Sequence, residues 1–262
     1  SLRKLFIKIP TLLPRIKPCM MMSPLAVSTY FNSPNAKFDV VIFDEASQVR
    51  PHDAISAVYR GTQLVVAGDP KQLPPTDFFS RTVAEDADAN DDEAGTAGFE
   101  SLLDIALALG LTHKRLKWHY RSRHEGLIAF SNKHFYDGNL VTFPSADAGA
   151  RPVRFVHVAD GRFESGVNVI EARRVAGLVI DHARKSPDRS LGVIAFSQQQ
   201  QNRILDELDA RRKENPDLED FFSPERPERF FVKNLENVQG DERDAILLSV
   251  GYGPNATGFV SM

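Results

Sequence analysis

Apolar and polar positions along the chain fall into blocks that predict strands and helices in alternation. The expected strands are short runs rich in Val, Ile and Phe, a pattern typical of sheets that are covered on both faces. The segments between them repeat their apolar residues with a helical period. We expect strands over residues 19–22, 38–43, 63–67, 115–119, 153–157, 191–196, 230–233 and 245–251, and helices over residues 25–31, 53–59, 99–109, 125–135, 169–185 and 199–214.

This alternation predicts parallel sheets and an α/β fold. Ser23 before Pro24 indicates a helix N-cap followed by proline at the first helical position. Gly110 indicates the stop of another helix. We expect a domain boundary after that helix, near residues 111–114, and a loop over residues 80–98 inside the first domain.

Composition limits the class of protein and its compartment. The 262 residues are 42% hydrophobic and 26% charged, which is ordinary for a soluble globular protein of one or two domains. Cys19 is the single cysteine, so an internal disulfide and a multi-cysteine zinc cluster are excluded. A reducing compartment is expected, the cytoplasm or, in a eukaryote, the nucleus. No apolar run reaches the roughly 18 residues of a membrane span. Net charge is −3, with six acids within residues 85–93, a run that predicts a solvated loop.

Polar clusters follow several expected strands, where ligands bind in open α/β sheets. Asp44 and Glu45 follow "DVVIF", and "GDPKQLPP" at residues 68–75 follows "QLVVA". Farther on, "NLENVQGDERD" at residues 234–244 leads into "AILLSVGY". Two carboxylates at the end of a buried strand favour magnesium binding and water activation, although they could also simply end a strand at the surface.

Four segments carry a family resemblance. "VVIFDEASQV" resembles the magnesium-binding Walker B motif of the superfamily 1 helicases, and "LVVAGDPKQLPP" resembles the motif that follows it. "WHYRSRHEGLIAFSNKHFY" resembles the opening of the second motor domain in the Upf-like, 5′→3′ branch, which contains the RNA helicase of nonsense-mediated decay. "FFVKNLENVQGDERDAILLSVGYG" resembles the motif that pairs a Gln-Gly turn with an acid and a strand.

These four motifs stand in the family order over residues 38–252. The resemblance implies two RecA-like motor domains with parallel sheets, both incomplete. Residues 1–112 would form the C-terminal part of the first domain, and residues 113–262 the second domain, truncated at its C-terminus.

The resemblance also implies a nucleotide site for ATP and Mg²⁺. Asp44 would hold Mg²⁺ directly or through water, and Glu45 would orient and deprotonate the attacking water. Gln72 would contact the γ-phosphate and that water, the alternative being an ordinary loop amide. Asp69 would fix the turn before Pro70, or it would support the metal site without binding the metal itself.

Residues of the later motifs would complete this nucleotide site. Arg121 is the expected arginine finger, with Arg123 as its rival. Tyr120 would stack on the base, or else be a partly buried core aromatic. The cofactor-binding role extends to three residues of the Gln-Gly turn, in which the acid contacts the sugar or an adjoining phosphate group: Gln239, Gly240 and Glu242.

Contacts with single-stranded nucleic acid are implied at three positions. The Ser23 hydroxyl would grip a strand phosphate, unless it is an ordinary helix cap. Pro74 and Pro75 would form a wall against bases, or only shape their loop. Family positions of the last motif that often hold a hydroxyl, an aromatic and a small or basic residue hold Asn234, Val238 and Asp241 here.

One expected motif is absent. None of the 16 glycines is followed by Lys, so the sequence contains no GxxxxGK[ST] phosphate loop. The late segment with a second arginine is missing too. We therefore expect a central slice of a helicase that couples ATP hydrolysis to movement on single-stranded DNA or RNA, inactive as an isolated piece. The alternatives are a non-catalytic module that binds nucleic acid or a partner, and a metal-dependent nuclease using Asp44 and Glu45.

Overall fold

A computed structural model describes residues 8–9, 12–31, 37–75, 99–147, 149–255 and 257. The backbone divides into two compact units, unit 1 over residues 1–152 and unit 2 over residues 153–262. The loop expected over residues 80–98, with its acidic run, lies outside the described residues. None of the helices in the described part combines the length and apolar character that crossing a membrane requires.

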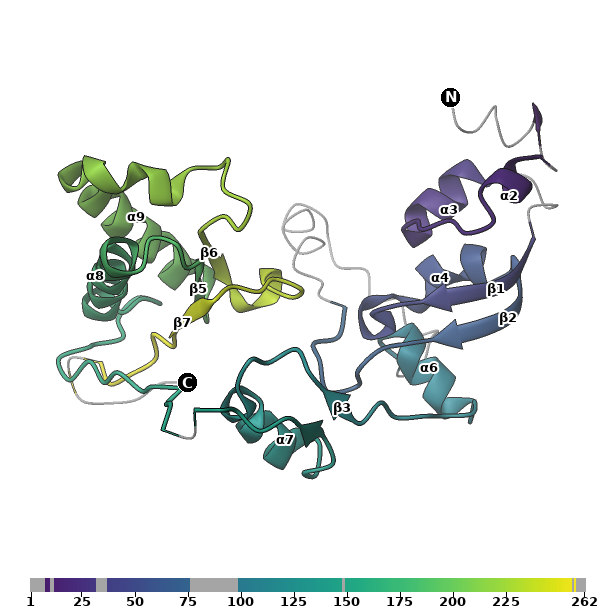
Figure 1. The fold of residues 1–262 in the computed structure, drawn as a ribbon, viewed down its shortest axis with the longest axis horizontal. Helices are drawn as coiled ribbons and strands as arrows, with labels where there is room; N and C mark the ends of the chain where they lie inside the picture. Colours follow the sequence, from purple (N-terminus) through teal and green to yellow (C-terminus); the bar gives the residue numbers. More distant parts are fainter. Residues whose placement is uncertain are drawn as a thin grey trace. The chain divides into compact units, whose positions relative to one another are not determined.

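Unit 1 is built around two short pairs of parallel strands (Figure 1). In the first pair, Phe43 lies opposite Val66 in the register. An apolar cluster packs against this pair and includes Phe43, Ala54 and Leu102. In chain order the elements of unit 1 are α2 (Leu12–Ile16), α3 (Pro24–Tyr30), β1 (Phe38–Phe43), η1 (Ala46–Gln48), α4 (Pro51–Val58), β2 (Gly61–Val66), α6 (Leu102–Ala108), β3 (Trp118–His119), η2 (Glu125–Leu127), α7 (Ala129–Phe135) and β4 (Val141–Thr142).

Unit 2 contains a three-stranded parallel sheet in the order β6-β5-β7, on which two long helices pack (Figure 1). All five residues of the central strand β5 are buried, as expected for a strand covered on both faces. The helix before it buries one face at helical spacing. The elements of unit 2 are α8 (Val169–Lys185), β5 (Leu191–Ala195), α9 (Gln198–Glu214), η3 (Pro216–Phe222), β6 (Phe231–Asn234), η4 (Leu235–Asn237) and β7 (Ala245–Ser249).

The predicted α/β class with parallel strands is confirmed. The helix expected over residues 169–185 has the same bounds in the structure, and most others agree within three residues. Ser23 caps α3, where its hydroxyl accepts a hydrogen bond from the Ala26 amide at 3.2 Å. Gly110 ends α6 with a φ of +67°, which glycine adopts without strain.

Two predicted strands are wrong. Residues 19–22 and 153–157 are described, and neither forms part of a sheet. Phe155 is 89% exposed. An apolar run becomes a strand only when a neighbouring strand offers hydrogen-bonding partners, and within the described residues these two segments lie outside every sheet.

The boundary between motor domains stays a prediction. The compact units meet at residues 152 and 153, because the segment over residues 113–147 packs with unit 1. The predicted boundary, after residue 112, instead marks where the family motifs of the second motor domain begin. The first division reflects backbone packing and the second reflects motif order.

A buried polar network connects the ends of α8, α9 and β7. The Gln200 side chain is 1% exposed; its carbonyl oxygen accepts from the Asn168 amide at 2.8 Å, and its amide donates to the Asn168 carbonyl and the Ser249 hydroxyl. Ser249 in turn donates to Glu171 at 2.7 Å. Because buried polar groups must be hydrogen-bonded, this network ties three elements of unit 2 together.

Gln200→Ala is expected to destabilise unit 2 by about 2–4 kcal/mol, through a cavity and the loss of partners for buried groups of Asn168 and Ser249. Backbone hydrogen exchange of α8, α9 and β5 measures the effect within this unit. The matched control is Gln199→Ala, one residue earlier and exposed, for which a change within about 0.5 kcal/mol is expected. Equal effects of the two substitutions would show that the network contributes little to stability.

Candidate nucleotide site at the ends of β1 and β2

Two exposed carboxylates follow the buried end of β1. Phe43 is buried, whereas Asp44 and Glu45 are exposed. An oxygen of Asp44, Oδ1, accepts a hydrogen bond from the Glu45 amide at 3.0 Å. Glu45 has φ 52° and ψ 40°, the left-handed region, which costs a residue with a side chain about 1–2 kcal/mol. Strain of this kind is concentrated at functional sites, so the turn is consistent with the carboxylate roles predicted from the sequence.

The end of β2 lies directly against this turn. The Ala46 amide donates to the Ala67 carbonyl at 2.9 Å, and the Ala67 amide donates to the Phe43 carbonyl at 2.8 Å. A Cβ at Gly68 would lie 3.1 Å from the backbone nitrogens of Ala46 and Ser47, tighter than nine in ten real Cβ contacts. Glycine therefore permits the two polar clusters to lie close together at the edge of the β1–β2 pair.

Asp69 organises the turn that carries Gln72. Its Oδ1 accepts from the Lys71 amide at 2.9 Å, and its backbone carbonyl accepts from the Gln72 amide at 3.1 Å. The Gln72 side-chain amide donates to Asp69 Oδ2 at 3.5 Å. Asp69 thus fixes the turn, the first of the two roles expected for it. Gln72 and Pro74 are exposed and Pro75 is half-buried.

Arg121 lies in a short, ordered turn after β3. The Ser122 hydroxyl is 2.7 Å from His119 Nε2, and the Ser122 amide donates to the same nitrogen at 3.3 Å. Arg121 and Arg123 are both exposed, and Tyr120 is 81% exposed. The alternative of a partly buried core aromatic at Tyr120 is therefore wrong, and its contact with a base stays a prediction.

Ser23 acts as an ordinary cap in the structure, since its hydroxyl accepts from the Ala26 amide. A phosphate contact at Ser23 stays a prediction. The same holds for the proposed wall formed by Pro74 and Pro75.

The Gln-Gly turn lies in unit 2, between η4 and β7. Gly240 has φ +87°, and the Asp241 amide donates to the Val238 carbonyl at 3.0 Å, which closes the turn. Lys233 forms an ion pair with Asp241. Gln239 is half-buried and Glu242 is exposed.

The two polar departures from the family pattern support this turn. Asn234 is 4% exposed; its side-chain oxygen accepts from the Asn237 amide at 3.1 Å, and its amide donates to Gln198 at 3.2 Å. Asp241 contributes the carboxylate of the ion pair with Lys233. Both residues therefore hold the loop in shape, a role that the sequence comparison with the family does not suggest.

The donor set around β1 suits magnesium better than a metal held wholly by protein. The described residues contain no group of three or more His, Cys, Asp and Glu side chains placed to hold a metal ion. Magnesium is commonly bound by one or two carboxylates together with waters and substrate phosphates. Asp44 and Glu45, exposed at the strand end, fit that requirement.

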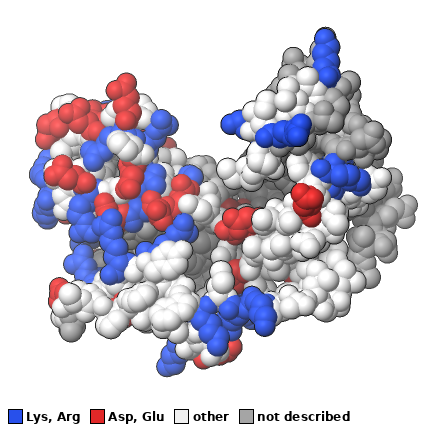
Figure 2. All heavy atoms as spheres, turned by 45° about the vertical axis from the view of Figure 1, so that its right-hand side comes forward, with Lys and Arg blue, Asp and Glu red and all other residues white. Residues whose placement is uncertain are grey.

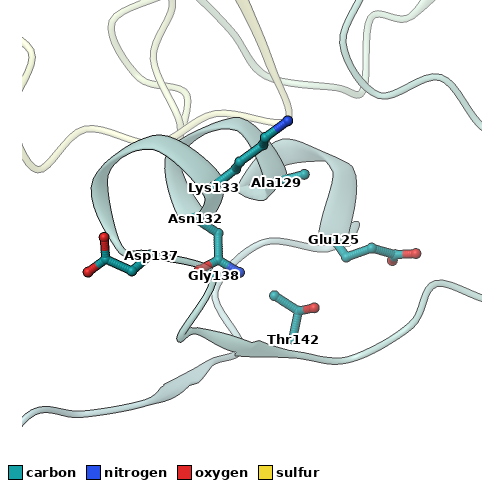
Figure 3. Close-up of a pocket in the computed structure, with 7 residues that line it drawn as sticks. All are labelled: Glu125, Ala129, Asn132, Lys133, Asp137, Gly138 and Thr142. Atoms are coloured by element: carbon teal, nitrogen blue, oxygen red, sulfur yellow. The ribbon is translucent and has the colours of Figure 1, made fainter.

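A hollow of about 440 Å³ lies beside α7, and its lining includes none of the predicted site residues (Figure 3). Two of its polar side chains already serve the local fold. The Glu125 carboxylate accepts from the Ser145 amide at 2.6 Å, and a bond from its own backbone amide, followed by this one, lowers the pKa of Glu125. Asn132 donates to the Leu140 carbonyl and accepts from the Leu140 amide. The hollow is lined by Glu125, Ala129, Asn132, Lys133, Asp137, Gly138 and Thr142.

The face of unit 2 seen in Figure 2 carries charges of both signs. Several are paired, as in Arg212–Glu219 at 2.6 Å and Arg173–Glu207 at 3.2 Å. A mixed surface of this kind favours solubility and does not mark a nucleic-acid interface by charge.

Comparisons with known proteins give consistent matches. Two models described as AAA domain match residues 24–80 and 99–261. A Mycoplasma genitalium protein named as the uncharacterized ATP-dependent helicase MG140 is 35% identical over 254 residues, covering 92% of this chain and 22% of that protein. The mouse 5′-3′ DNA helicase ZGRF1 is 28% identical over 228 residues, 81% of this chain and 11% of its own. Yeast helicase SEN1 is 25% identical over 235 residues, 81% of this chain and 10% of its own. The chain thus spans about a fifth or less of the length of these relatives.

Proposed function

Because the chain belongs to the Upf-like branch of the superfamily 1 helicases, with an AAA domain over residues 99–261, we propose that the whole protein uses ATP and Mg²⁺ to move along single-stranded nucleic acid. The observation that carries the proposal is the turn at the end of β1, where Asp44 precedes a left-handed Glu45 and the backbone of the next two residues packs against Gly68. The resemblance favours movement in the 5′→3′ direction.

In this proposal each of four residues of unit 1 has a separate role in ATP hydrolysis. Magnesium would neutralise charge on the phosphates, with Asp44 as its protein ligand. Glu45 accepts a proton from the attacking water and orients it. Gln72 contacts the water and the γ-phosphate, and Arg121 stabilises charge that develops on the transferring group.

The remaining assignments concern binding. Tyr120 stacks on the base, while Gln239, Gly240 and Glu242 contact the nucleotide from the turn in unit 2. The strand of nucleic acid is contacted at Ser23, Pro74 and Pro75. The exposure of Tyr120 and Pro74 supports these assignments, because each side chain is accessible to a ligand.

Single-strand-stimulated ATP hydrolysis by the whole protein tests the function. Phosphate release is measured with and without a single-stranded DNA or RNA oligonucleotide. We expect stimulation by at least one of the two, and comparison of them identifies the preferred strand. Binding of the oligonucleotide without any ATP hydrolysis would instead indicate a non-catalytic module.

The 262-residue chain alone is expected to bind ATP weakly and not to hydrolyse it. Its sequence contains no phosphate loop, whose backbone amides and lysine supply most contacts with the β- and γ-phosphates. Phosphate release and titration with a fluorescent ATP analogue measure the two properties. Steady turnover that disappears in Glu45→Gln would contradict this prediction.

A further inference from the structure

The hydroxyl of Tyr136 contacts the turn that carries Gln72. Tyr136 follows α7 directly, and its hydroxyl donates a hydrogen bond to Asp69 Oδ2 at 2.6 Å. The two residues are 67 positions apart in the sequence but lie in the same compact unit. A short bond to a carboxylate is stronger than a neutral one, so this contact restrains Asp69.

Asp69 uses its other bonds to hold the Gln72 turn. Oδ1 accepts from the Lys71 amide at 2.9 Å, and Oδ2, the atom that Tyr136 contacts, also accepts from the Gln72 side-chain amide at 3.5 Å. The Tyr136 hydroxyl and the Gln72 side-chain amide therefore both donate to the same oxygen of the Asp69 carboxylate, and together they set its orientation. If the hydroxyl is removed, this carboxylate loses its strongest restraint.

Tyr136 is itself held in place by its surroundings. Its backbone amide donates to the Asn132 carbonyl at 3.3 Å, and its carbonyl accepts from the Asn139 amide at 2.9 Å. The guanidinium of Arg115 lies 5.5 Å from the centre of its ring, within the range of a cation–π contact. A ring fixed on several sides can position what it contacts.

The hydroxyl remains a donor at neutral pH. Burial, followed by the hydrogen bond to Asp69 and the charge of that carboxylate, raises the pKa of Tyr136 from 10.0 to about 12. Because the pKa in the folded protein is higher than in the unfolded chain, the contact contributes its full stability below about pH 10 and loses it as the pH rises through about 12.

We propose that Tyr136 is a positioning residue for Gln72, acting through Asp69. The contact couples the segment after β3, which carries Arg121, to the turn after β2. This inference rests on the proposed function, in which Gln72 contacts the attacking water and the γ-phosphate.

The kinetic test is Tyr136→Phe in the whole protein. We expect kcat for strand-stimulated ATP hydrolysis to fall about tenfold, less than the roughly 100-fold loss that a 1 Å misplacement can cause, while KM for ATP changes less than about twofold. Asp69→Asn should lower kcat as well, and the double variant should lose less than the sum of the two effects. The matched control is Tyr59→Phe, which removes a hydroxyl from an exposed tyrosine of the same unit. Equal activity of wild type and Tyr136→Phe would overturn the proposal.

A second measurement judges the contact without ATP hydrolysis. In the 262-residue chain with labelled tyrosine, the signal of the oxygen-bearing ring carbon should show that the Tyr136 hydroxyl keeps its proton at about pH 11, because its pKa is raised to about 12. Tyr136→Phe should shift and mobilise the side-chain amide signal of Gln72, and Tyr59→Phe should leave it unchanged. An unaltered Gln72 signal would refute the positioning role. Absence of ATP hydrolysis in the wild-type whole protein would refute the proposed function, so the two failures are distinct.

Discussion

Glu45→Gln in the whole protein is expected to lower kcat for ATP hydrolysis by about 10²–10⁴-fold, the usual contribution of a positioned general base. Glutamine keeps the size of the side chain but cannot accept a proton from water at neutral pH. Because Glu45 is exposed next to Asp44 rather than packed in the core, the substitution should leave the fold and the KM for ATP nearly unchanged. Phosphate release under saturating ATP and oligonucleotide measures the effect.

The matched control is Glu100→Gln, an exposed glutamate of the same unit. We expect its kcat to stay within about twofold of wild type, because surface substitutions away from a site have small effects. Asp44→Asn separates the two carboxylates, since it should raise the magnesium concentration needed for half-maximal activity. If Glu45→Gln retained wild-type kcat, the general base would have to be another residue.

The long, periodic elements of the fold were predictable from the sequence. Helix α8 buries residues at regular helical spacing, and β5 is an uninterrupted apolar run, so each carries its own signal. Short elements carry less information: β3 and β4 have two residues each and exist only as a pair. The helix expected over residues 125–135 is divided at Ile128 into η2 and α7, a change of backbone geometry that apolar period does not reveal.

The same distinction applies to the candidate site. Asp44, Glu45 and the turn over residues 68–72 each follow a strand, so their meeting at one sheet edge follows from parallel topology. Tyr136 has no such signal, because its contact with Asp69 depends on how distant segments fold together. Gln200 likewise has no signal that distinguishes it within a run of four glutamines, although it is the buried one. Contacts between distant segments are set by tertiary packing, which a local pattern does not encode.

The local structure around Arg121 and Arg123 bears on which of them is the arginine finger. Arg121 lies inside the turn that His119 and Ser122 hold together, whereas Arg123 comes after it, immediately before the residue that caps η2. A finger must be presented in a fixed geometry, because its guanidinium matches the phosphoryl oxygens through a rigid set of donors. The ordered turn therefore favours Arg121.

Arg121→Ala in the whole protein is expected to lower kcat by about 10³–10⁵-fold, the range for arginine fingers in phosphoryl transfer. Arg121→Lys should recover only part of this loss, since a single ammonium cannot form the paired contacts of a guanidinium. Arg123→Ala is the matched control, two positions away and also exposed. Oligonucleotide binding without ATP should be similar in all three variants, which separates a catalytic loss from misfolding. If Arg123→Ala caused the larger loss of kcat, the finger would be Arg123, and the turn held by His119 and Ser122 would serve only to shape the approach to η2.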